Sequence, residues 1–318
     1  MSFTIFALYA KDCSGMKLLT KLMRGFLRVL SALPLGFHYA WTGFFAWILR
    51  DVMHYRRDVV TTNIARSFPE KKYKEIKAIT DGFYKHFGEI AAEAIWFGGC
   101  RNPQRLHRRH LVEMTNPELL DEVYTNGRGA VILNSHFGNW ELSGGIPFYD
   151  YRPDFKGTSY EINDVFVVYK PLKSKVWNEV MRFNRCAPVL RSGYKGYVSS
   201  GEVLRLALSR KDKKSIYLFP TDQSPYKGST SNDEVEFMHQ KTKTMLGGAS
   251  IAHKFGYAVL SMSLDRESRG HYKWTYRLIC ADASTMTPHE IMQEYYNILQ
   301  QDLEKHPSNY LWSHKRWK

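Results

Sequence analysis

From residue 129 onward, the sequence alternates short apolar runs with longer amphipathic segments, and this pattern restricts the fold more than any other feature. Runs that predict strands are residues 129–135, 165–170, 187–192, 215–220, 257–265 and 271–279. Segments with helical spacing of apolar residues are 173–185, 199–210, 244–255 and 288–306. Strands that alternate with helices build an α/β sheet covered on both faces. In such sheets, reactive side chains tend to follow the carboxyl ends of the strands.

The part of the chain before residue 100 has helical character. The segment TTNIARSFPEK predicts a helix that stops before Pro69, and residues 73–96 carry apolar side chains at helical spacing. With 318 residues and 44% hydrophobic content, the chain can bury one large core. We divide it into an N-terminal segment, residues 1–55, and one domain, residues 56–318. Residues 1–15 differ in character from the residues after them, so Met16 is an alternative start.

Residues 29–49 form an apolar stretch without Asp, Glu, Lys or Arg. About 20 apolar residues suffice to span a bilayer as a helix. Pro34 and Gly36 interrupt the stretch, however, and basic residues flank it on both sides. We therefore expect a helical segment that lies in or dips into one membrane leaflet, with Trp41 and Trp47 at the interface. The alternative is a hydrophobic helix buried in the core.

The charge of the chain points to anionic partners. There are 45 Lys and Arg against 31 Asp and Glu, which gives a net charge of +14. Nucleic acid, an anionic membrane surface and an acidic protein all fit such an excess. Residues 173–185 mix basic and aromatic side chains as nucleic-acid surfaces do, but no nucleic-acid motif accompanies them. We expect a membrane surface or lipid head group there, and no nucleic acid.

Several other classes of chemistry lack support in the sequence. The four cysteines, Cys13, Cys100, Cys186 and Cys280, form no C-x-x-C pair, so a reducing compartment is expected. His107 and His110 have a spacing that a metal can use, but no third ligand is evident, and a solvated basic surface is the better interpretation. There is no Walker A loop, G-x-S-x-G elbow or G-x-G-x-x-G motif.

The strongest chemical candidate follows the apolar run at residues 129–135. His136 comes directly after this run, and Glu141 lies five residues further on, where a helix would begin. A turn at Gly138 and Asn139 can bring the carboxylate back to the imidazole. A carboxylate on one ring nitrogen leaves the other nitrogen free to take a proton from an attacking alcohol. From the spacing alone, a histidine that merely caps a turn between strand and helix is an equal alternative.

Several segments carry a resemblance to a known family. The segment NSHFGNWE resembles the H-x4-D/E block of glycerolipid acyltransferases, and most closely that of the lauroyl/myristoyl acyltransferases of bacterial lipid A assembly. The resemblance covers residues 16–318 and implies a glycerolipid-acyltransferase-like mixed sheet flanked by helices. Further segments match the family in the same order: RRDVVTTNIARSFPE, VVYKPLKSKVWNEVMRFNR, TDQSP and NYLWSHKRWK.

The resemblance also implies roles for single residues. His136 corresponds to the general base and Glu141 to the carboxylate that orients it. Lys170 falls where the family binds the phosphate of the acceptor, usually with arginine; lysine keeps the charge but loses the bidentate fork. Asp222 and Gln223 support the site or hold the acceptor, or else only cap a turn. We count as candidate substrate-binding residues Lys170, Arg185, Asp222, Gln223 and Asn139, whereas His314 is expected to be structural, packed with Trp312 and Trp317.

The implied activity is transfer of a fatty acyl chain from a thioester to a hydroxyl of a lipid, with a lipid A precursor as the first expected acceptor. The donor is acyl carrier protein, an acidic partner that suits the basic surface, or acyl-CoA. No metal or bound cofactor is needed, and the expected location is the cytoplasmic face of the inner membrane. Alternative acceptors are a lysophospholipid, an aminolipid or another glycolipid. A non-catalytic basic membrane-binding protein is the alternative from another class.

Overall fold

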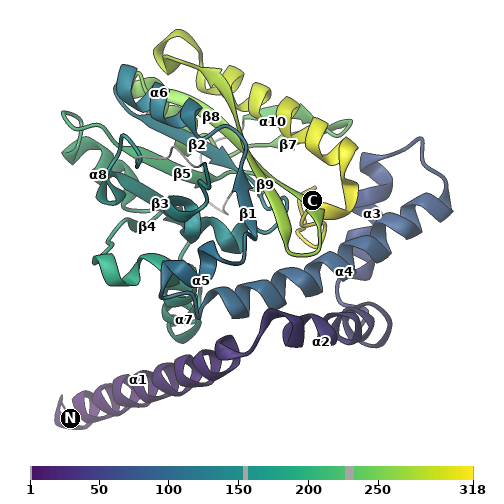
Figure 1. The fold of residues 1–318 in the computed structure, drawn as a ribbon, viewed down its shortest axis with the longest axis vertical. Helices are drawn as coiled ribbons and strands as arrows, with labels where there is room; N and C mark the ends of the chain where they lie inside the picture. The colour runs from purple at the N-terminus through teal and green to yellow at the C-terminus, as the bar shows by residue number, and fades with distance from the viewer. Residues whose placement is uncertain (1, 153–156, 226–232, 318) are drawn as a thin grey trace.

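The computed structural model describes residues 2–152, 157–225 and 233–317, with side chains from residue 15 onward. Its centre is a seven-stranded sheet in the order β1-β9-β8-β2-β5-β3-β4 (Figure 1). The strands of this sheet are β1 (Val112–Met114), β2 (Ala130–Asn134), β3 (Val165–Tyr169), β4 (Tyr197–Ser199), β5 (Ile216–Pro220), β8 (Ala258–Ser268) and β9 (His271–Cys280).

Most of the sheet is parallel. β8, β2, β5, β3 and β4 run in one direction, whereas β9 is antiparallel to β8 and parallel to β1. The carboxyl ends of β2, β5 and β3 therefore meet at one edge. β2 is an unbroken run of apolar residues up to Asn134, and all five of its residues are buried, as expected of a strand covered on both faces.

Helices cover both faces, and the residues of β2 alternate between them. Val131 and Leu133 pack into a core that α8, α9 and α10 share, whereas Ala130 and Ile132 pack into a second core with α6. This arrangement confirms the predicted α/β class with a mixed sheet between helices. The helices are α3 (Arg57–Ser67), α4 (Tyr73–Phe97), α5 (Pro103–His107), α6 (Glu118–Asn126), α7 (Lys175–Arg185), α8 (Val203–Ser209), α9 (Gly247–Phe255) and α10 (Pro288–Lys305).

One predicted strand is wrong. Residues 187–192 form the 3-10 helix η4 (Ala187–Ser192), which continues directly from α7 and ends at Gly193 with a positive φ of 72°. Pro188 has no backbone N–H for a strand ladder, so the apolar run turns instead of extending. The edge of the sheet is taken by β4. The short strand β1 and the hairpin of β6 (Glu234–Phe237) and β7 (Gln240–Lys243) were not predicted.

The N-terminal region consists of α1 (Ser2–Ala32), α2 (Leu35–Trp47) and a π-helical turn, η1 (Ile48–Val52). Pro34 separates the two helices because its ring cannot continue α1. In the described part of the chain, no helix combines the length and apolar character that crossing a membrane requires. Figure 1 shows α1 projecting from the body of the molecule.

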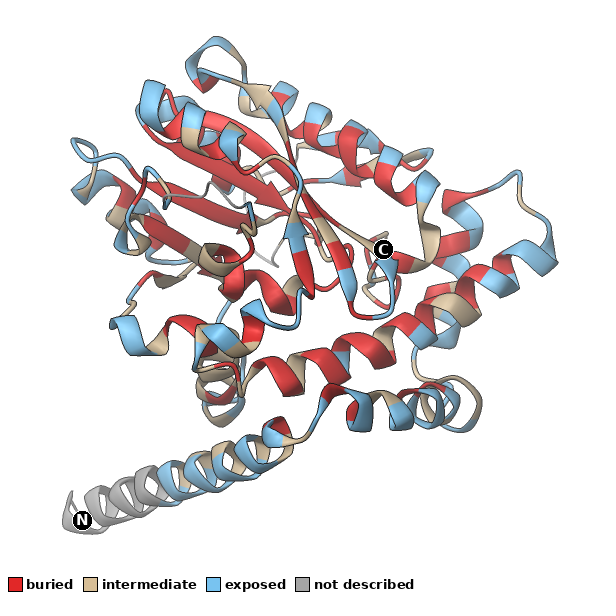
Figure 2. Cartoon of the chain, viewed as in Figure 1, coloured by how far each residue is buried: buried red, intermediate tan, exposed pale blue. Residues whose placement is uncertain are grey.

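Helix α2 packs with one face only. Its buried residues, Leu35, His38, Thr42 and Ala46, follow the three- and four-residue spacing of one helix face, and this face lies on α4. The opposite face exposes Phe37, Trp41, Phe44, Phe45 and Trp47 to about half of their surface, from 48% to 56% (Figure 2). The alternative of a hydrophobic helix buried in the core is therefore wrong.

Candidate active site

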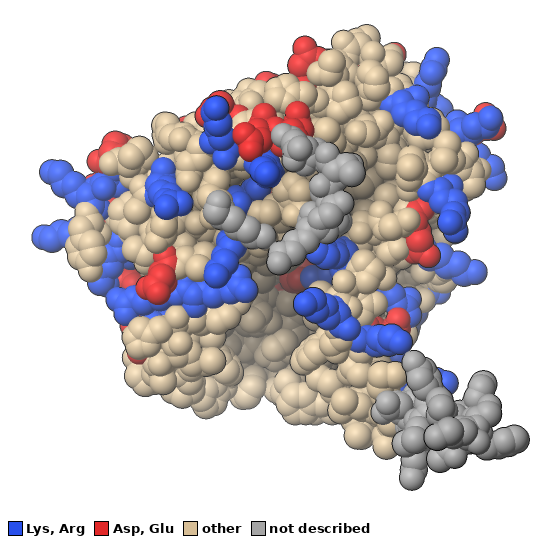
Figure 3. Space-filling model, turned by 180° about the vertical axis from the view of Figure 1, so that it is seen from behind, with Lys and Arg blue, Asp and Glu red and all other residues tan. Residues whose placement is uncertain are grey.

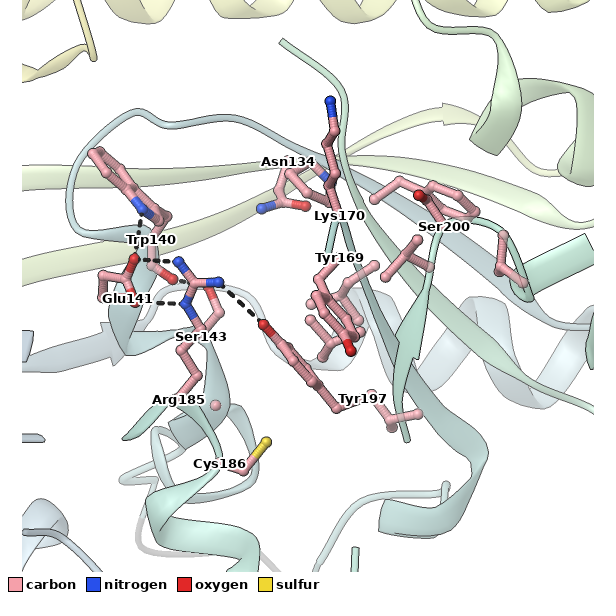
Figure 4. Close-up of a pocket in the computed structure, with 18 of the residues that line it drawn as sticks. Asn134, Trp140, Glu141, Ser143, Tyr169, Lys170, Arg185, Cys186, Tyr197 and Ser200 are labelled. Carbon is pink, nitrogen blue, oxygen red and sulfur yellow. Dashed lines mark hydrogen bonds and ion pairs between the residues drawn. The ribbon is translucent and has the colours of Figure 1, made fainter. Parts of the chain in front are cut away.

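A cavity of about 550 Å³ opens at the edge of the sheet where β2, β5 and β3 end. His136, Trp140 and Glu141 are among its lining residues, and Figure 4 shows Trp140 and Glu141 on the same side of it. Most of the remaining wall is apolar. Seen from behind, the molecule is hollowed, and Lys and Arg side chains are spread around the hollow (Figure 3). The apolar wall is formed chiefly by Ile146, Ile162, Val165, Val167, Val168, Val189, Val203, Leu218 and Phe219.

His136 is held by a carboxylate from the neighbouring strand. Its Nδ1 lies 2.8 Å from Oδ1 of Asp222, and its backbone N–H donates to Oδ2 of the same side chain at 3.0 Å. The sheet explains this pairing. Asn134 of β2 is in register with Pro220 of β5, so the residues two positions beyond each strand end become neighbours. Asp222 is 1% exposed, and it places the Nδ1 proton of the ring.

This geometry corrects the predicted partnership of His136 and Glu141. The Glu141 carboxylate pairs instead with Arg185, at 2.7 Å from Nε to Oε2 and 2.6 Å from Nη2 to Oε1 (Figure 4). It also accepts from Nε1 of Trp140 at 3.1 Å. Glu141 lies in the first turn of the 3-10 helix η2 (Trp140–Phe148), and its side chain reaches Arg185 at the end of α7. Asp222, predicted as a supporting residue, makes the contact expected of Glu141.

Both carboxylates are kept ionised inside the protein. Burial alone would raise the pKa of Asp222, but His136 and its two hydrogen bonds outweigh burial and hold the pKa below its ordinary value. Burial likewise acts to raise the pKa of Glu141, and Arg185 lowers it by more. In return, Glu141 raises the pKa of Arg185 against the effect of burial. The site therefore holds two buried carboxylates with separate partners: Asp222 is hydrogen-bonded to the imidazole, and Glu141 forms an ion pair with the guanidinium of Arg185.

His136 lines the cavity, and its second ring nitrogen, Nε2, lies beside Gln223, which also lines the cavity. With the proton on Nδ1 donated to Asp222, Nε2 carries a lone pair that can accept a proton, a tautomer assigned from these contacts. The Nε2 amide nitrogen of Gln223 lies 3.3 Å from this ring nitrogen and is oriented to donate to it. Gln223, predicted to support the site, therefore sits beside the atom that can take a proton.

The loop that carries His136 is clamped from several sides. Gly138 has φ +69°, and a Cβ there would lie 1.7 Å from the carbonyl oxygen of Leu264, so only glycine fits. The N–H of Gly138 donates to the carbonyl of Asn309 at 2.8 Å, and the N–H of Leu311 donates to the carbonyl of His136 at 3.1 Å. A β-bridge joins Phe137 and Tyr310. The C-terminal segment thus fixes the backbone on both sides of the histidine.

The remaining predicted residues separate into two groups. Lys170 is exposed at the end of β3 and lines the mouth of the cavity, apart from the pair of Glu141 and Arg185 (Figure 4). Asn139 is fully buried and does not line the cavity, contrary to its predicted role in binding substrate. Its Oδ1 accepts from the N–H of Glu141 at 3.2 Å, so it caps η2 instead.

The weaker histidine candidates have structural environments. His110 stacks on Tyr151, with ring centroids 4.0 Å apart, and His107 lies against the same ring. Among the described residues there is no group of three metal-ligating side chains. His314 lies in the C-terminal segment, and burial lowers its pKa to about 4.

Sequence reasoning missed several residues of the site. One is Tyr197, whose hydroxyl accepts a hydrogen bond from Nη1 of Arg185 at 3.0 Å. Glu93 accepts a hydrogen bond from Asn139 at 2.7 Å. A signal for Glu93 was available, since an acidic residue stands among the apolar positions of a long amphipathic helix. No local signal distinguished Tyr197 from the other 19 tyrosines of the chain.

Together, the mostly parallel sheet, the hydrogen-bonded pair of His136 and Asp222 and the largely apolar cavity beside them define an α/β protein with a candidate acid–base site. The family model described as bacterial lipid A biosynthesis acyltransferase matches residues 16–318, nearly the whole chain. The chain belongs to this acyltransferase family, as the sequence motifs predicted. A search of curated proteins found no match.

Proposed function

We propose that this protein is a lipid acyltransferase that moves a fatty acyl chain from a thioester to a hydroxyl of its acceptor. The observation that carries the proposal is the placement of His136. Its ring is anchored to Asp222 at 2.8 Å on one side and lines a largely apolar cavity of about 550 Å³ on the other. A non-catalytic binder would have no use for a base aimed into such a cavity. Membership in an acyltransferase family supports the same conclusion.

In the proposed reaction, Nε2 of His136 takes the proton of the acceptor hydroxyl as its oxygen attacks the thioester carbonyl. The tetrahedral intermediate collapses, the carbon–sulfur bond breaks, and the imidazolium returns the proton to the leaving thiolate. Asp222 stays ionised throughout and stabilises the imidazolium, because its pKa is held low by the same contact. Every atom of this cycle comes from donor, acceptor and His136.

The shape of the cavity suits an acyl chain. β3 lines it from Val165 to Tyr169, a length of about 13 Å at roughly 3.3 Å per residue. Apolar side chains from β3, β5, η2 and η4 surround this length. A fatty chain laid along β3 would bury its methylenes, each worth about 0.8 kcal/mol, and leave the thioester near His136.

For the donor and acceptor, the surface charge and the family support specific choices. The net charge of +14 suits an acidic acyl carrier protein as donor, with acyl-CoA as the alternative. Lys170 and Lys173 line the mouth of the cavity, where a phosphorylated head group would lie. We propose a lipid A precursor as acceptor, with a lysophospholipid, an aminolipid or another glycolipid as alternatives.

The proposal includes attachment to the cytoplasmic face of the inner membrane. On α1, exposed large apolar side chains alternate with basic residues, and α2 adds exposed aromatic side chains; together they favour an anionic lipid surface. The basic residues along α1 are Lys17, Lys21, Arg24 and Arg28.

The experiment that tests the function is acyl transfer by purified enzyme from acyl carrier protein and from CoA thioesters to a panel of lipid acceptors. His136→Ala should lower turnover about 10²–10⁴-fold while the fold stays intact. His271→Ala, at an exposed histidine of β9, is the matched control and should keep full activity. Near-normal turnover by folded His136→Ala enzyme would sink the assignment.

A further inference from the structure

A further buried carboxylate lies outside the cavity, next to the loop that carries His136. Glu93 of α4 is 0% exposed and accepts three hydrogen bonds. The hydroxyl of Tyr39 donates to Oε1 at 2.6 Å, and Oε2 accepts from Nδ2 of Asn139 at 2.7 Å and from the hydroxyl of Tyr272 at 2.7 Å. The donors come from α2, from the loop after β2 and from β9. Glu93 does not line the cavity, so it has no access to substrate.

One of these three bonds leads directly to the active site. The amide nitrogen of Asn139 donates to Glu93. Its Oδ1 accepts from the N–H of Glu141 at 3.2 Å, so Asn139 is the N-cap of η2. Glu141 in turn binds Arg185 in the cavity wall. His136 lies in the same short loop, three residues before Asn139. Glu93 therefore holds the end of the loop at Asn139, whereas the C-terminal segment holds residues 136–138.

Another of the bonds leads to the N-terminal region. Tyr39 belongs to α2, whose opposite face exposes its aromatic side chains. The two helices approach closely, since a Cβ on Gly88 of α4 would lie only 3.0 Å from the carbonyl oxygen of Thr42. In this contact the Tyr39 hydroxyl reaches across to the carboxylate. Seating of α2 on α4 thus supplies one of the three donors of Glu93.

Loss of one hydrogen-bond donor would destabilise the buried carboxylate of Glu93. A buried polar atom without a partner costs far more than an exposed one, because no water replaces the lost hydrogen bond. If α2 shifts, Oε1 of Glu93 loses its donor, and the side chain must turn toward its remaining donors or let water in. Either change moves the oxygen that holds Asn139. A shift at α2 is therefore transmitted to the loop over two hydrogen bonds.

We propose that Glu93 is a positioning residue for the catalytic loop, and that the hydroxyl of Tyr39 makes this positioning depend on the seating of α2. The inference rests on the proposed function, because it assumes chemistry at His136 and a lipid surface on α2. In consequence, a lipid surface that presses α2 onto α4 favours the active geometry. The enzyme turns over fastest when it is docked.

Two matched variants test the proposal. Tyr39→Phe and Tyr272→Phe each remove one hydroxyl from the same carboxylate, but only the first lies on α2. The first measurement is hydrolysis of a water-soluble short-chain thioester, with and without phosphatidylethanolamine–phosphatidylglycerol vesicles. We expect vesicles to stimulate the wild type and Tyr272→Phe, and Tyr39→Phe to lose most of the stimulation. Glu93→Gln, which offers one acceptor oxygen instead of two, should lower kcat about 10- to 100-fold with little change in KM.

The second measurement does not require activity. Hydrogen exchange of the amides at residues 136–142 should slow in wild type when vesicles are added, should not slow in Tyr39→Phe, and should be faster throughout in Glu93→Gln. Equal vesicle responses in the two tyrosine variants, or unchanged exchange in Glu93→Gln, would overturn the proposal. If the wild type shows the exchange pattern but no acyl transfer, the proposed function fails and the positioning role stands.

Discussion

The edge of the sheet and the α2 helix differ from most folded proteins in opposite ways, one by burying charged side chains and the other by exposing apolar ones. At the sheet edge, charged side chains are buried: Asp222 is 1% exposed and Glu141 is 8% exposed. On α2, large aromatic side chains are exposed, with Phe45 at 56%. Both buried carboxylates pair with side chains from other elements, whereas the ring contacts of Trp41, Phe44, Phe45 and Trp47 in the described chain are with one another. An exposed apolar surface costs a protein less than an unpaired buried charge. The buried charges must therefore be paired within the chain, whereas the apolar face of α2 can stay exposed until an external partner binds it.

The strongest way to break this comparison is to remove the internal partner of the base. Asp222→Asn keeps the shape of the side chain but removes its charge and favours the wrong imidazole tautomer. We expect turnover to fall about 10²–10⁴-fold. Glu141→Gln should disturb the His136 tautomer less, because the Glu141 carboxylate pairs with Arg185 and not with the imidazole. Steady-state kinetics on both folded variants checks this order, and a far larger loss for Glu141→Gln would return the orienting role to Glu141.

The next test removes the cation from a buried pair. Arg185→Ala leaves the Glu141 carboxylate uncompensated, and we expect a loss of about 3–5 kcal/mol in the free energy of unfolding. The double variant Arg185→Met, Glu141→Leu should recover much of this stability, because it removes both charges together. Urea unfolding of the single and double variants measures the difference. Additive losses would show that the two side chains do not depend on one another.

Substitutions on the exposed aromatic face of α2 should have a smaller effect, on binding to vesicles. Trp41→Ser together with Phe44→Ser removes two large apolar groups that contact little within the chain. We expect weaker binding to anionic vesicles, by about tenfold or more, with an unchanged or slightly higher free energy of unfolding. Co-sedimentation and urea unfolding provide the two readouts. A marked loss of stability would assign these side chains to the core and end the contrast between the two regions.

The last test concerns pH. Burial lowers the pKa of His314 from 6.5 to about 4, so the unfolded chain binds its proton first as the pH falls. Stability supplied by the neutral ring is complete above pH 6.5 and is lost between pH 6.5 and about 4. His314→Asn should flatten the pH dependence of the free energy of unfolding in that window alone. Identical slopes for wild type and variant would contradict the lowered pKa.

The regular part of the fold was readable from sequence. Continuous apolar runs predicted β2 and β5, and helical spacing predicted α4 and α10, because each pattern reports local burial. The place of His136 followed from the same rule. The strand expected at residues 187–192 failed because Pro188 outweighs the apolar pattern around it.

Which side chains pair with one another in the site could not be predicted from the sequence. Whether Asp222 or Glu141 takes the imidazole depends on the register of two strands far apart in sequence and on where η2 points its first turn. The inward orientation of Asn139 likewise depends on Glu93 from a separate helix. Spacing brings candidates together but does not decide between two carboxylates within reach of one ring.

The clamp on the histidine loop has a consequence for protein synthesis. The backbone of residues 136–138 bonds to residues 309–311, which are translated last among the partners of the site. At about 5–20 residues per second, they follow His136 from the ribosome by roughly 10–35 s. The aromatic face of α2 emerges well before that. The proposed lipid-binding face is therefore synthesised before the active site can be completed. C-terminal fusions that strain residues 309–311 should impair activity without altering the proposed attachment to lipid.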